Sequence, residues 1–363
     1  MKEINIFGSF GFGNIGDEII PQCFSEATGS IDGALVVNTF SRYNHTIVES
    51  VLDHNEYLNR DLEGPIFVCG GGIVENHPMS CLNRAMEKKS HQNAIIPFAI
   101  SVEPGVKFSF LKRLKLNDTM KKIGKAYIRD RLSSKILRRI CPKVDQEVVG
   151  DLGLWCHSNS SIEILKNLPD RYFVFIPSDN WKDENFIRWV SNEIIRISEE
   201  LGCPPVILPI SFLAGADDII AKRIYDRIVS SAPGIELIRI DRDTLGRAPT
   251  GTDIAAALAN SDLTVSMRLH GCVISYAQKT PFVALAYHPK LQGFLETVEW
   301  EFAMAPSRLP PMQTPMSYGY RFSDLDLGEQ DLLKSAIRAL NNQSYHMLEE
   351  YKGIQRRVLG SIF

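Results

Sequence analysis

Several features are scarce or missing in this chain of 363 residues, and each absence excludes a class of protein. No apolar run approaches the roughly 20 residues of a membrane-spanning helix. The seven cysteines occur singly inside apolar stretches, without the paired spacing of a zinc site or a redox motif, so we expect reduced thiols. A formal net charge of −3 gives no general electrostatic basis for binding nucleic acid. We therefore expect a soluble cytoplasmic protein in which any site for an anion is local.

What is present is a regular alternation of short apolar runs with longer amphipathic stretches. This pattern is typical of βα units around a parallel sheet, and helical examples are Glu184 to Leu201 and Asp217 to Ser231. The expected strands are Ile4 to Gly8, Ala34 to Asn38, Pro65 to Cys69, Ala94 to Ile100, Lys125 to Arg129 and Glu147 to Val149, and then Tyr172 to Pro177, Pro205 to Ile210, Ile235 to Ile240, Leu263 to Ser266 and Phe282 to Ala286.

The length of the chain exceeds what one core usually organises, so we expect two domains. The polar stretch 157–170 separates the two series of strands and is the expected linker. This gives an N-terminal Rossmann-like domain over 1–156 and a C-terminal Rossmann-like domain over 171–327. A helical segment follows at 328–363, and its helix from Glu329 to Tyr351 can cross back to the first domain. The expected fold is α/β, with two Rossmann-like domains facing a cleft.

The motif from Ser266 to Gly271 is the most informative in the chain. It stands where an apolar strand gives way to a helix, so Arg268 and His270 are expected together at the carboxyl end of a sheet, where α/β proteins bind ligands. The next predicted strand is followed by His288 and Lys290, which brings a second imidazole and a further cation to the same edge. Such an edge suits a small polyanion.

A glycine-rich loop from Gly8 to Glu18 follows the first predicted strand and satisfies G-x-G-x-x-G. A dinucleotide site is disfavoured, because carboxylates beginning at Asp17 occupy the helix start that a pyrophosphate needs, and because the second strand ends in Asn38 rather than in an acid. Asp17 can also simply cap the helix. We expect Gly13 and Asn14 to let a neutral, hydroxyl-rich ligand approach the backbone.

A second glycine turn, Gly70 to Gly72, follows the third predicted strand. Gly71 and Gly72 can serve either ligand approach or tight turning, and the residues alone do not separate the two. Glu75 and Asn76 can accept hydroxyls of a sugar, although a lone glutamate in a turn is more often only solvated.

Two arginines flank Asp130 at the end of the predicted strand Lys125 to Arg129. One of them can pair with Asp130, and the other is a ligand for an anion. Around them, residues 107–139 hold twelve Lys or Arg against two acids, with Phe108, Phe110, Leu111, Leu114 and Leu116 interleaved in the first part. The residues alone favour a solvated face, whereas a lipid-linked ligand would favour contact with an anionic bilayer or a lipid diphosphate.

Together these motifs resemble the polysaccharide pyruvyl transferase family, from about Gly8 to about Phe294. The resemblance implies a fold similar to the B-type glycosyltransferases. It also implies transfer of the enolpyruvyl group of phosphoenolpyruvate onto two hydroxyls of one sugar, which forms a cyclic pyruvate ketal. Phosphoenolpyruvate is then a co-substrate, and neither a cofactor nor a metal is implied. The matching elements are Gly11 to Glu18, Gly70 to Gly72, Arg129-Asp130 with Ser133, Gly150-Asp151, Pro209 with Asp217-Asp218, Ser266 to Gly271 and Tyr287 to Lys290.

The family's phosphoenolpyruvate-binding Arg-Leu-His maps onto Arg268, Leu269 and His270, and a further arginine of the family maps onto Arg129. Guanidiniums match a carboxylate and a phosphate well, and Lys290 adds a cation. His270 receives the general acid and base role, because ketal formation needs proton delivery and removal. His288 is a second candidate, although it can also serve only to shape the turn.

The resemblance places the acceptor in the N-terminal domain and phosphoenolpyruvate in the C-terminal domain. The acceptor is expected to be a lipid-linked precursor of a capsule or exopolysaccharide, at the inner face of the cytoplasmic membrane. One departure lies at Pro177 to Trp181, where relatives often have an arginine before the tryptophan. Two other functions stay open: a nucleotide-sugar glycosyltransferase of the same architecture, and a non-catalytic carbohydrate-binding module. The concentration of positive charge at Arg268 and Lys290 counts against the latter.

Overall fold

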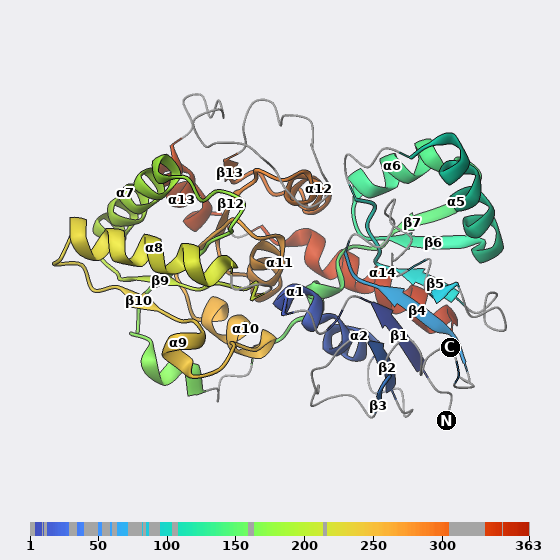
Figure 1. Ribbon diagram of the computed structural model, residues 1–363, viewed down its shortest axis with the longest axis horizontal. Coiled ribbons are helices and arrows are strands. Elements are labelled where there is room, and N and C mark those ends of the chain that lie inside the picture. The colour runs from blue at the N-terminus through green and yellow to red at the C-terminus, as the bar shows by residue number, and fades with distance from the viewer. Residues whose placement is uncertain are drawn as a thin grey trace. The chain divides into compact units, whose positions relative to one another are not determined.

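The computed structural model divides the chain into two compact units (Figure 1). Unit 1 comprises Met1–Phe12, Asp17–Trp155 and Glu349–Phe363, and unit 2 comprises Gly13–Gly16 and Cys156–Leu348. The last predicted segment, 328–363, is therefore shared between the units. The structure describes residues 4–8, 10, 13–28, 35–39, 50–52, 59, 64–71, 82, 85–86, 95–103, 108–158, 163–212, 216–304, 331–342 and 344–362.

Unit 1 contains a parallel sheet with the strand order β3-β2-β1-β4-β5. A bridge between Ile100 and Ile128 continues this sheet from β5 to β6, which pairs in parallel with β7. The strands are β1 (Ile4–Gly8), β2 (Leu35–Thr39), β3 (Ser50–Leu52), β4 (Ile66–Cys69), β5 (Ile95–Phe98), β6 (Lys125–Ile128) and β7 (Asp145–Val148).

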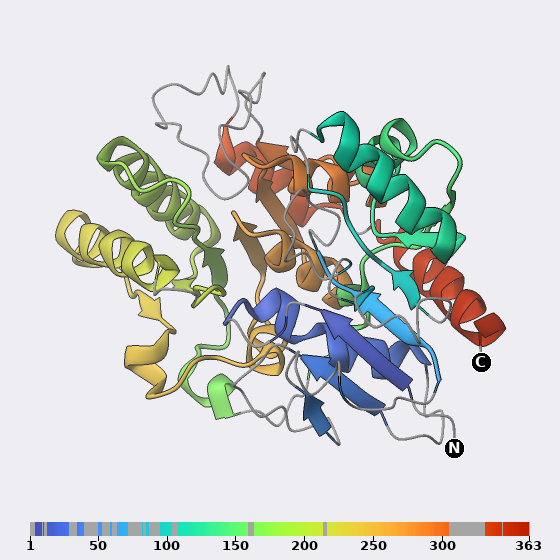
Figure 2. The same cartoon turned by 45° about the vertical axis from the view of Figure 1, so that its right-hand side comes forward.

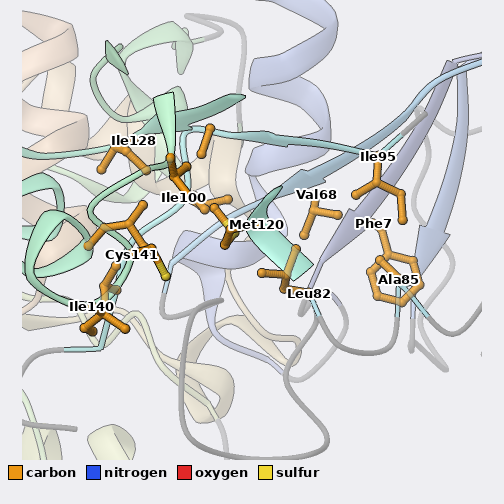
Figure 3. Close-up of a cluster of buried hydrophobic side chains, with 14 of the residues drawn as sticks. Phe7, Val68, Leu82, Ala85, Ile95, Ile100, Met120, Ile128, Ile140 and Cys141 are labelled. Carbon is orange, nitrogen blue, oxygen red and sulfur yellow. The ribbon is translucent and has the colours of Figure 1, made fainter. Parts of the chain in front are cut away.

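The core of unit 1 lies between the sheet and the helices that follow β5 and β6. Figure 3 shows the cluster in which Phe7 and Val68 from the strands pack with Met120, Ile140 and Cys141 from the helical layer. Buried β-branched and aromatic strand residues thus hold the two layers together. The helices of this unit are α2 (Ile20–Thr28), α5 (Phe110–Ile123), α6 (Arg131–Ile140) and most of α14 (His346–Ile362), with the short η2 (Leu152–Trp155), while α1 (Ile15–Glu18) begins in unit 2.

Helix α14 is fixed to unit 1 by a buried glutamine. Gln355 accepts a hydrogen bond from Trp155 Nε1 at 2.5 Å and donates one to the carbonyl of Val149 at 2.9 Å. Gly150, with a φ of 84°, lies against the ring of Tyr351, where a Cβ would come within 2.9 Å of that ring. These contacts tie the end of the chain to the segment that follows β7.

Unit 2 contains a six-stranded parallel sheet with the order β10-β9-β8-β11-β12-β13. Crossovers between parallel strands are right-handed, so the direction in which the chain adds strands decides which face a helix covers. The chain adds strands in one direction up to β10 and in the other direction from β11, which puts α7 and α8 on one face of the sheet and α11 and α12 on the other. Helices α7 and α8 lie side by side in both views (Figures 1 and 2). The strands are β8 (Phe173–Ile176), β9 (Pro205–Ile207), β10 (Ile238–Arg239), β11 (Leu263–Ser266), β12 (Phe282–Leu285) and β13 (Ala303–Met304), and the helices are η3 (Glu163–Asn167), α7 (Glu184–Leu201), α8 (Ala216–Ser231), α9 (Arg242–Leu245), α10 (Gly251–Ala259), α11 (Leu269–Gln278), α12 (Pro289–Val298) and α13 (Leu332–Leu340).

The predicted α/β class with parallel sheets is confirmed, and the predicted single helix from Glu329 to Tyr351 is wrong. Helix α13 ends at Leu340, and α14 begins at His346. The break has a local cause, because the side chain of Asn342 accepts a hydrogen bond from the backbone of Ser344 and so competes with helical bonding. The predicted strand over 235–240 is reduced to the two residues of β10. In the part of the chain that the structure describes, no helix combines the length and apolarity needed to cross a bilayer.

Candidate functional site

The strand order of unit 2 defines a switch point between β8 and β11. The chain leaves β8 in one direction towards β9 and β10 and later returns to the opposite side of β8 at β11. Ligands of open α/β sheets bind outside the carboxyl ends of strands at such a point. Ser178 and Asp179 follow β8 there, and Arg268 and His270 follow β11.

The backbone around Arg268 is held by the motif in which it lies. Ser266 Oγ accepts a hydrogen bond from the backbone N–H of Arg268 at 3.1 Å and donates one to its carbonyl at 2.8 Å. Gly271 permits this turn, because a Cβ there would lie 2.3 Å from Ser266 Oγ and 2.6 Å from Cδ1 of Ile176. Met267 continues the ladder by donating to the carbonyl of Ile176 at 3.0 Å. The small residues of the motif thus bring the turn onto β8.

The guanidinium of Arg268 is paired with two carboxylates. Its Nε donates to Asp217 Oδ2 at 3.0 Å, and its Nη2 donates to Asp217 Oδ1 and, at 2.8 Å, to Asp179 Oδ1. Asp217 is fully buried and also accepts from the backbone N–H groups of Asp179 and Ser211. Burial lowers the pKa of Arg268, but the charge of Asp217 outweighs it and raises that pKa. Among the described residues Nη1 makes no hydrogen bond, so this nitrogen is the donor left for an anion.

A buried polar group supports the loop after β8. The hydroxyls of Ser178 and Tyr287 are hydrogen-bonded at 2.8 Å, and Asn180 Nδ2 donates to both oxygens at 2.8 Å. The Tyr287 ring packs on Trp181 with centroids 4.9 Å apart. Burial raises the pKa of Tyr287, so its hydroxyl stays protonated near neutral pH. Tyr287 therefore ties the turn after β12 to the loop that carries Asp179.

His270 lies against the glycine-rich loop from the start of the chain. Its ring packs so closely on Gly16 that an added Cβ would come within 1.7 Å of Nδ1, and the side chain is 8% exposed. The loop is held in unit 2 by two backbone hydrogen bonds, from Ile15 to the carbonyl of Ile210 at 3.1 Å and from Phe212 to the carbonyl of Gly13 at 2.7 Å. The last glycine of the G-x-G-x-x-G pattern thus provides room for an imidazole.

The other predicted donor-binding residues of unit 2 lie near the same edge of the sheet. Leu269 begins α11 and is buried. His288 caps α12, because its Nδ1 accepts a hydrogen bond from the backbone N–H of Lys290 at 3.0 Å. Lys290 is partly exposed in the first turn of that helix. The turn-shaping function considered for His288 is therefore present in the structure.

Arg129 belongs to unit 1, where it follows β6 and is 4% exposed. Its Nε lies 3.2 Å from Asp130 Oδ2 and 3.5 Å from Asp151 Oδ2. Burial lowers the pKa of Arg129, but Asp130 and Asp151 outweigh this effect and raise it. Among the described residues its buried Nη2 has no hydrogen-bond partner. A buried guanidinium N–H in this state is a suitable donor for an anion.

Two predicted acceptor residues lie close to Arg129 within unit 1. A Cβ on Gly71 would come within 2.7 Å of Arg129 Nη1, and the carboxylate of Asp17 is near enough to raise the pKa of Arg129. Gly13 and Asn14 instead belong to unit 2, where Asn14 bridges to Ser211. The predicted residues Gly72, Glu75 and Asn76 lie outside the described residues.

Sequence reasoning predicted that Asp130 can pair with a neighbouring arginine, but it gave no separate role to the other acids that pair with Arg129 and Arg268. Asp217 opens α8 and Asp179 follows β8, and both positions are also common for residues that cap helices or shape turns. Asp151 follows a glycine in the same way. An acid in a loop after a strand, or at the start of a helix, is too weak a signal to identify a partner that lies from 22 to 89 residues away. In the described ranges no group of three or more His, Cys, Asp or Glu could hold a metal ion.

Solved structures similar to this chain share its fold. A UDP-N-acetylglucosamine 2-epimerase from Rickettsia bellii is 10% identical, with a TM-score of 0.59 over 100% of this chain and 96% of its own. The UDP-GlcNAc 2-epimerase of Methanocaldococcus jannaschii, in complex with UDP-GlcNAc and UDP, is 13% identical, with a TM-score of 0.54 over 98% of this chain and 99% of its own. At this identity the likeness establishes the fold alone, which is that of the B-type glycosyltransferases.

A comparison of sequences establishes the family. No curated protein matches the chain. A sequence model of the polysaccharide pyruvyl transferases matches residues 14–289, which include the end of the glycine loop from Asn14, Arg129 and the segment from Ser266 to Pro289. The match covers well over half of the chain and contains both arginine sites described above. This protein belongs to the polysaccharide pyruvyl transferase family.

Proposed function

We propose that this protein transfers the enolpyruvyl group of phosphoenolpyruvate onto two hydroxyls of one sugar. The methylene carbon of phosphoenolpyruvate takes up a proton and becomes a methyl group, and the first hydroxyl adds to the neighbouring carbon. Phosphate then leaves, and the second hydroxyl adds to the same carbon, which closes the ketal. Each hydroxyl gives up one proton, so one of the two protons replaces the one taken up by the methylene carbon and the other leaves with the phosphate. The reaction therefore needs a group that first donates a proton and then accepts one.

The observation that carries this proposal is the juxtaposition of Arg268 and His270 at the switch point of a sheet in a chain of this family. Arg268 is held rigidly by Asp217 and Asp179, so that Nη1 offers a fixed donor to a carboxylate or phosphate. His270 is the proposed acid and base, and Lys290 supplies the additional positive charge. Leu269 and His288 complete the donor side of the proposal.

The proposed acceptor-binding residues that the structure describes are Asp17 and Gly71 in unit 1, and Gly13 and Asn14 in unit 2. We propose a carbohydrate of a capsule or exopolysaccharide precursor, carried on a lipid at the inner face of the cytoplasmic membrane. Arg129 is the further arginine proposed to bind phosphoenolpyruvate, and its buried Nη2 supports contact with an anionic group. No cofactor or metal is part of the proposal.

The proposal is tested with purified protein, phosphoenolpyruvate and a panel of simple and lipid-linked glycosides. We expect release of phosphate that depends on the acceptor, together with a product whose mass has increased by one pyruvate ketal. A chelator should leave the rate unchanged. Nucleotide sugars replace phosphoenolpyruvate in a parallel panel, and transfer from them without any from phosphoenolpyruvate would identify a glycosyltransferase instead.

The role of His270 is tested by His270→Ala. We expect this variant to bind phosphoenolpyruvate but to lose turnover by a factor of about 10² or more, because the proton-transfer group is gone. The matched control is His157→Ala, since His157 is an exposed histidine of the same unit. Wild-type turnover in His270→Ala would remove the assignment.

A further inference from the structure

Helix α5 of unit 1 has apolar side chains on two opposite faces. Leu116, Met120 and Ile123 face the core, where Met120 is fully buried and the other two pack against the same cluster. Phe110 and Leu111 are 73% and 75% exposed. The first two turns of the helix therefore present large apolar side chains to solvent, which folding of unit 1 does not require.

The exposed apolar residues form a stripe. Successive residues of an α-helix are rotated by about 100°, so Phe110, Leu114 and Leu111 fall within an arc of about 100°. This arc lies on the side of the helix opposite to the one from which Met120 enters the core. Leu114 is 51% exposed, in agreement with this geometry. The same rotation per residue places Lys121, in the later turns of the helix, within this arc.

The surroundings of the stripe are strongly basic. Between residues 108 and 144, nine Lys or Arg are exposed, whereas Asp118 is the one exposed acid of this described range. Helices α5 and α6 share one layer over β6 and β7 (Figures 1 and 2), and Asn117 Nδ2 joins them by donating to the carbonyl of Ile140 at 2.8 Å. The exposed cations of this surface are Lys112, Arg113, Lys115, Lys121, Lys122, Lys135, Arg138, Arg139 and Lys143.

We infer that the outer face of α5 binds the surface of an anionic phospholipid bilayer. Phe110, Leu111 and Leu114 insert among the lipid headgroups, and the surrounding cations contact their phosphates. An apolar stripe surrounded by cations matches both parts of a membrane interface, the apolar acyl chains and the anionic headgroups. A nucleic-acid backbone would satisfy the charge but leave the apolar side chains exposed, so the charge and the stripe together favour lipid. The inference holds whether or not the protein transfers pyruvate.

Co-sedimentation of the full-length protein with vesicles tests this inference. Vesicles of phosphatidylcholine are compared with vesicles that also contain phosphatidylglycerol. We expect binding to the anionic vesicles only, weakened by salt. In F110Q/L111Q/L114Q the partition coefficient should fall at least about tenfold, since glutamine preserves the helix but cannot insert. In K115Q/K121Q/K122Q it should fall about 10²-fold, because each cation near such a surface contributes about fivefold.

The matched control is I219Q/V229Q on α8, where Ile219 and Val229 are 60% and 45% exposed on a helix that also carries acids. This variant should bind vesicles as the wild type does. Equal binding to both kinds of vesicle, or an equal loss in the control, overturns the inference. It also fails if the apolar variant keeps wild-type vesicle binding but dissociates an oligomer in ultracentrifugation, because the stripe then joins two copies of this chain. None of these measurements depends on activity.

Discussion

Replacement of Gly16 by alanine would act directly on the imidazole of His270. Gly16 lies in the first turn of α1 and has no positive φ, so its backbone accepts an alanine, and the change alone would favour the helix slightly. The new methyl group, however, would lie 1.7 Å from Nδ1 and 2.1 Å from Cγ of His270. Because backbone hydrogen bonds at Gly13 and Ile15 hold the loop in place, we expect the ring to move rather than the loop.

The size of the effect follows from the contact distance. Non-bonded heavy atoms rest about 3.5 Å apart, so the ring of His270 has to move by roughly 2 Å. A misplacement of about 1 Å can cost a catalytic group about 10²-fold, and general acid–base catalysis contributes about 10²- to 10⁴-fold in total. If His270 moves protons as proposed, kcat in Gly16→Ala should fall by about 10²- to 10³-fold. Because a buried ring has to leave its position, the free energy of unfolding should also fall, by about 1–3 kcal/mol.

The measurement is acceptor-dependent phosphate release, combined with the nitrogen resonances of the His270 ring. The matched control is Gly234→Ala in the same unit, where an added Cβ meets no atom within 4 Å. The double variant with His270→Ala should be no slower than His270→Ala alone, because both changes remove the same group. Wild-type turnover together with an unshifted His270 resonance in Gly16→Ala would refute the reasoning.

Two further substitutions probe charge. Asp179→Asn keeps an acceptor for Arg268 but removes a negative charge beside the proposed anion site. We expect phosphoenolpyruvate to bind about three- to tenfold more tightly, which corresponds to about 0.7–1.4 kcal/mol for a largely solvated charge pair, and the gain should be smaller in high salt. Calorimetry checks this, and weaker binding would contradict it. Burial raises the pKa of Asp218 to about 6 despite Arg242, so the folded protein loses stability as pH rises from about 4 to 6. Asp218→Asn should raise the free energy of unfolding by about 1–2 kcal/mol at pH 7, a gain that is limited because Asp218 is partly exposed, and should leave it unchanged below pH 4. Denaturant titrations at both pH values check this, and an equal gain at both would contradict the assignment.

The strands of both sheets could be predicted because burial marks them locally. Parallel strands covered on both faces are continuous apolar runs, as at β8 and β12, and these runs are bounded by glycine, proline or polar residues. The position of Arg268 and His270 follows from the same pattern, since a strand that gives way to a helix must end at the carboxyl edge. Short strands such as β3 and β13 carry too few residues for such a signal.

The pairings that organise the site could not be predicted, because they join residues far apart in the chain. Asp217 meets Arg268 across 51 positions, and Gly16 meets His270 across more than 250. The glycine loop is a further example. Its pattern is that of a phosphate-binding turn, yet the backbones of Gly13 and Ile15 are hydrogen-bonded to the segment that follows β9. No local periodicity in the sequence predicts this contact.

Ion pairing changes what Arg268 can contribute to the proposed reaction. Asp217 and Asp179 engage Nε and Nη2, so the guanidinium plane cannot turn to follow a ligand, and its remaining nitrogen points in a fixed direction. Two carboxylates around one guanidinium leave a net negative charge, so Arg268 gives direction rather than attraction. Attraction of a small polyanion must then come from cations outside this cluster, and Lys290 follows the next strand at the same edge of the sheet. An unpaired arginine would also attract phosphoenolpyruvate. It would not, however, fix the orientation in which the methylene carbon of phosphoenolpyruvate faces the proton-donating group.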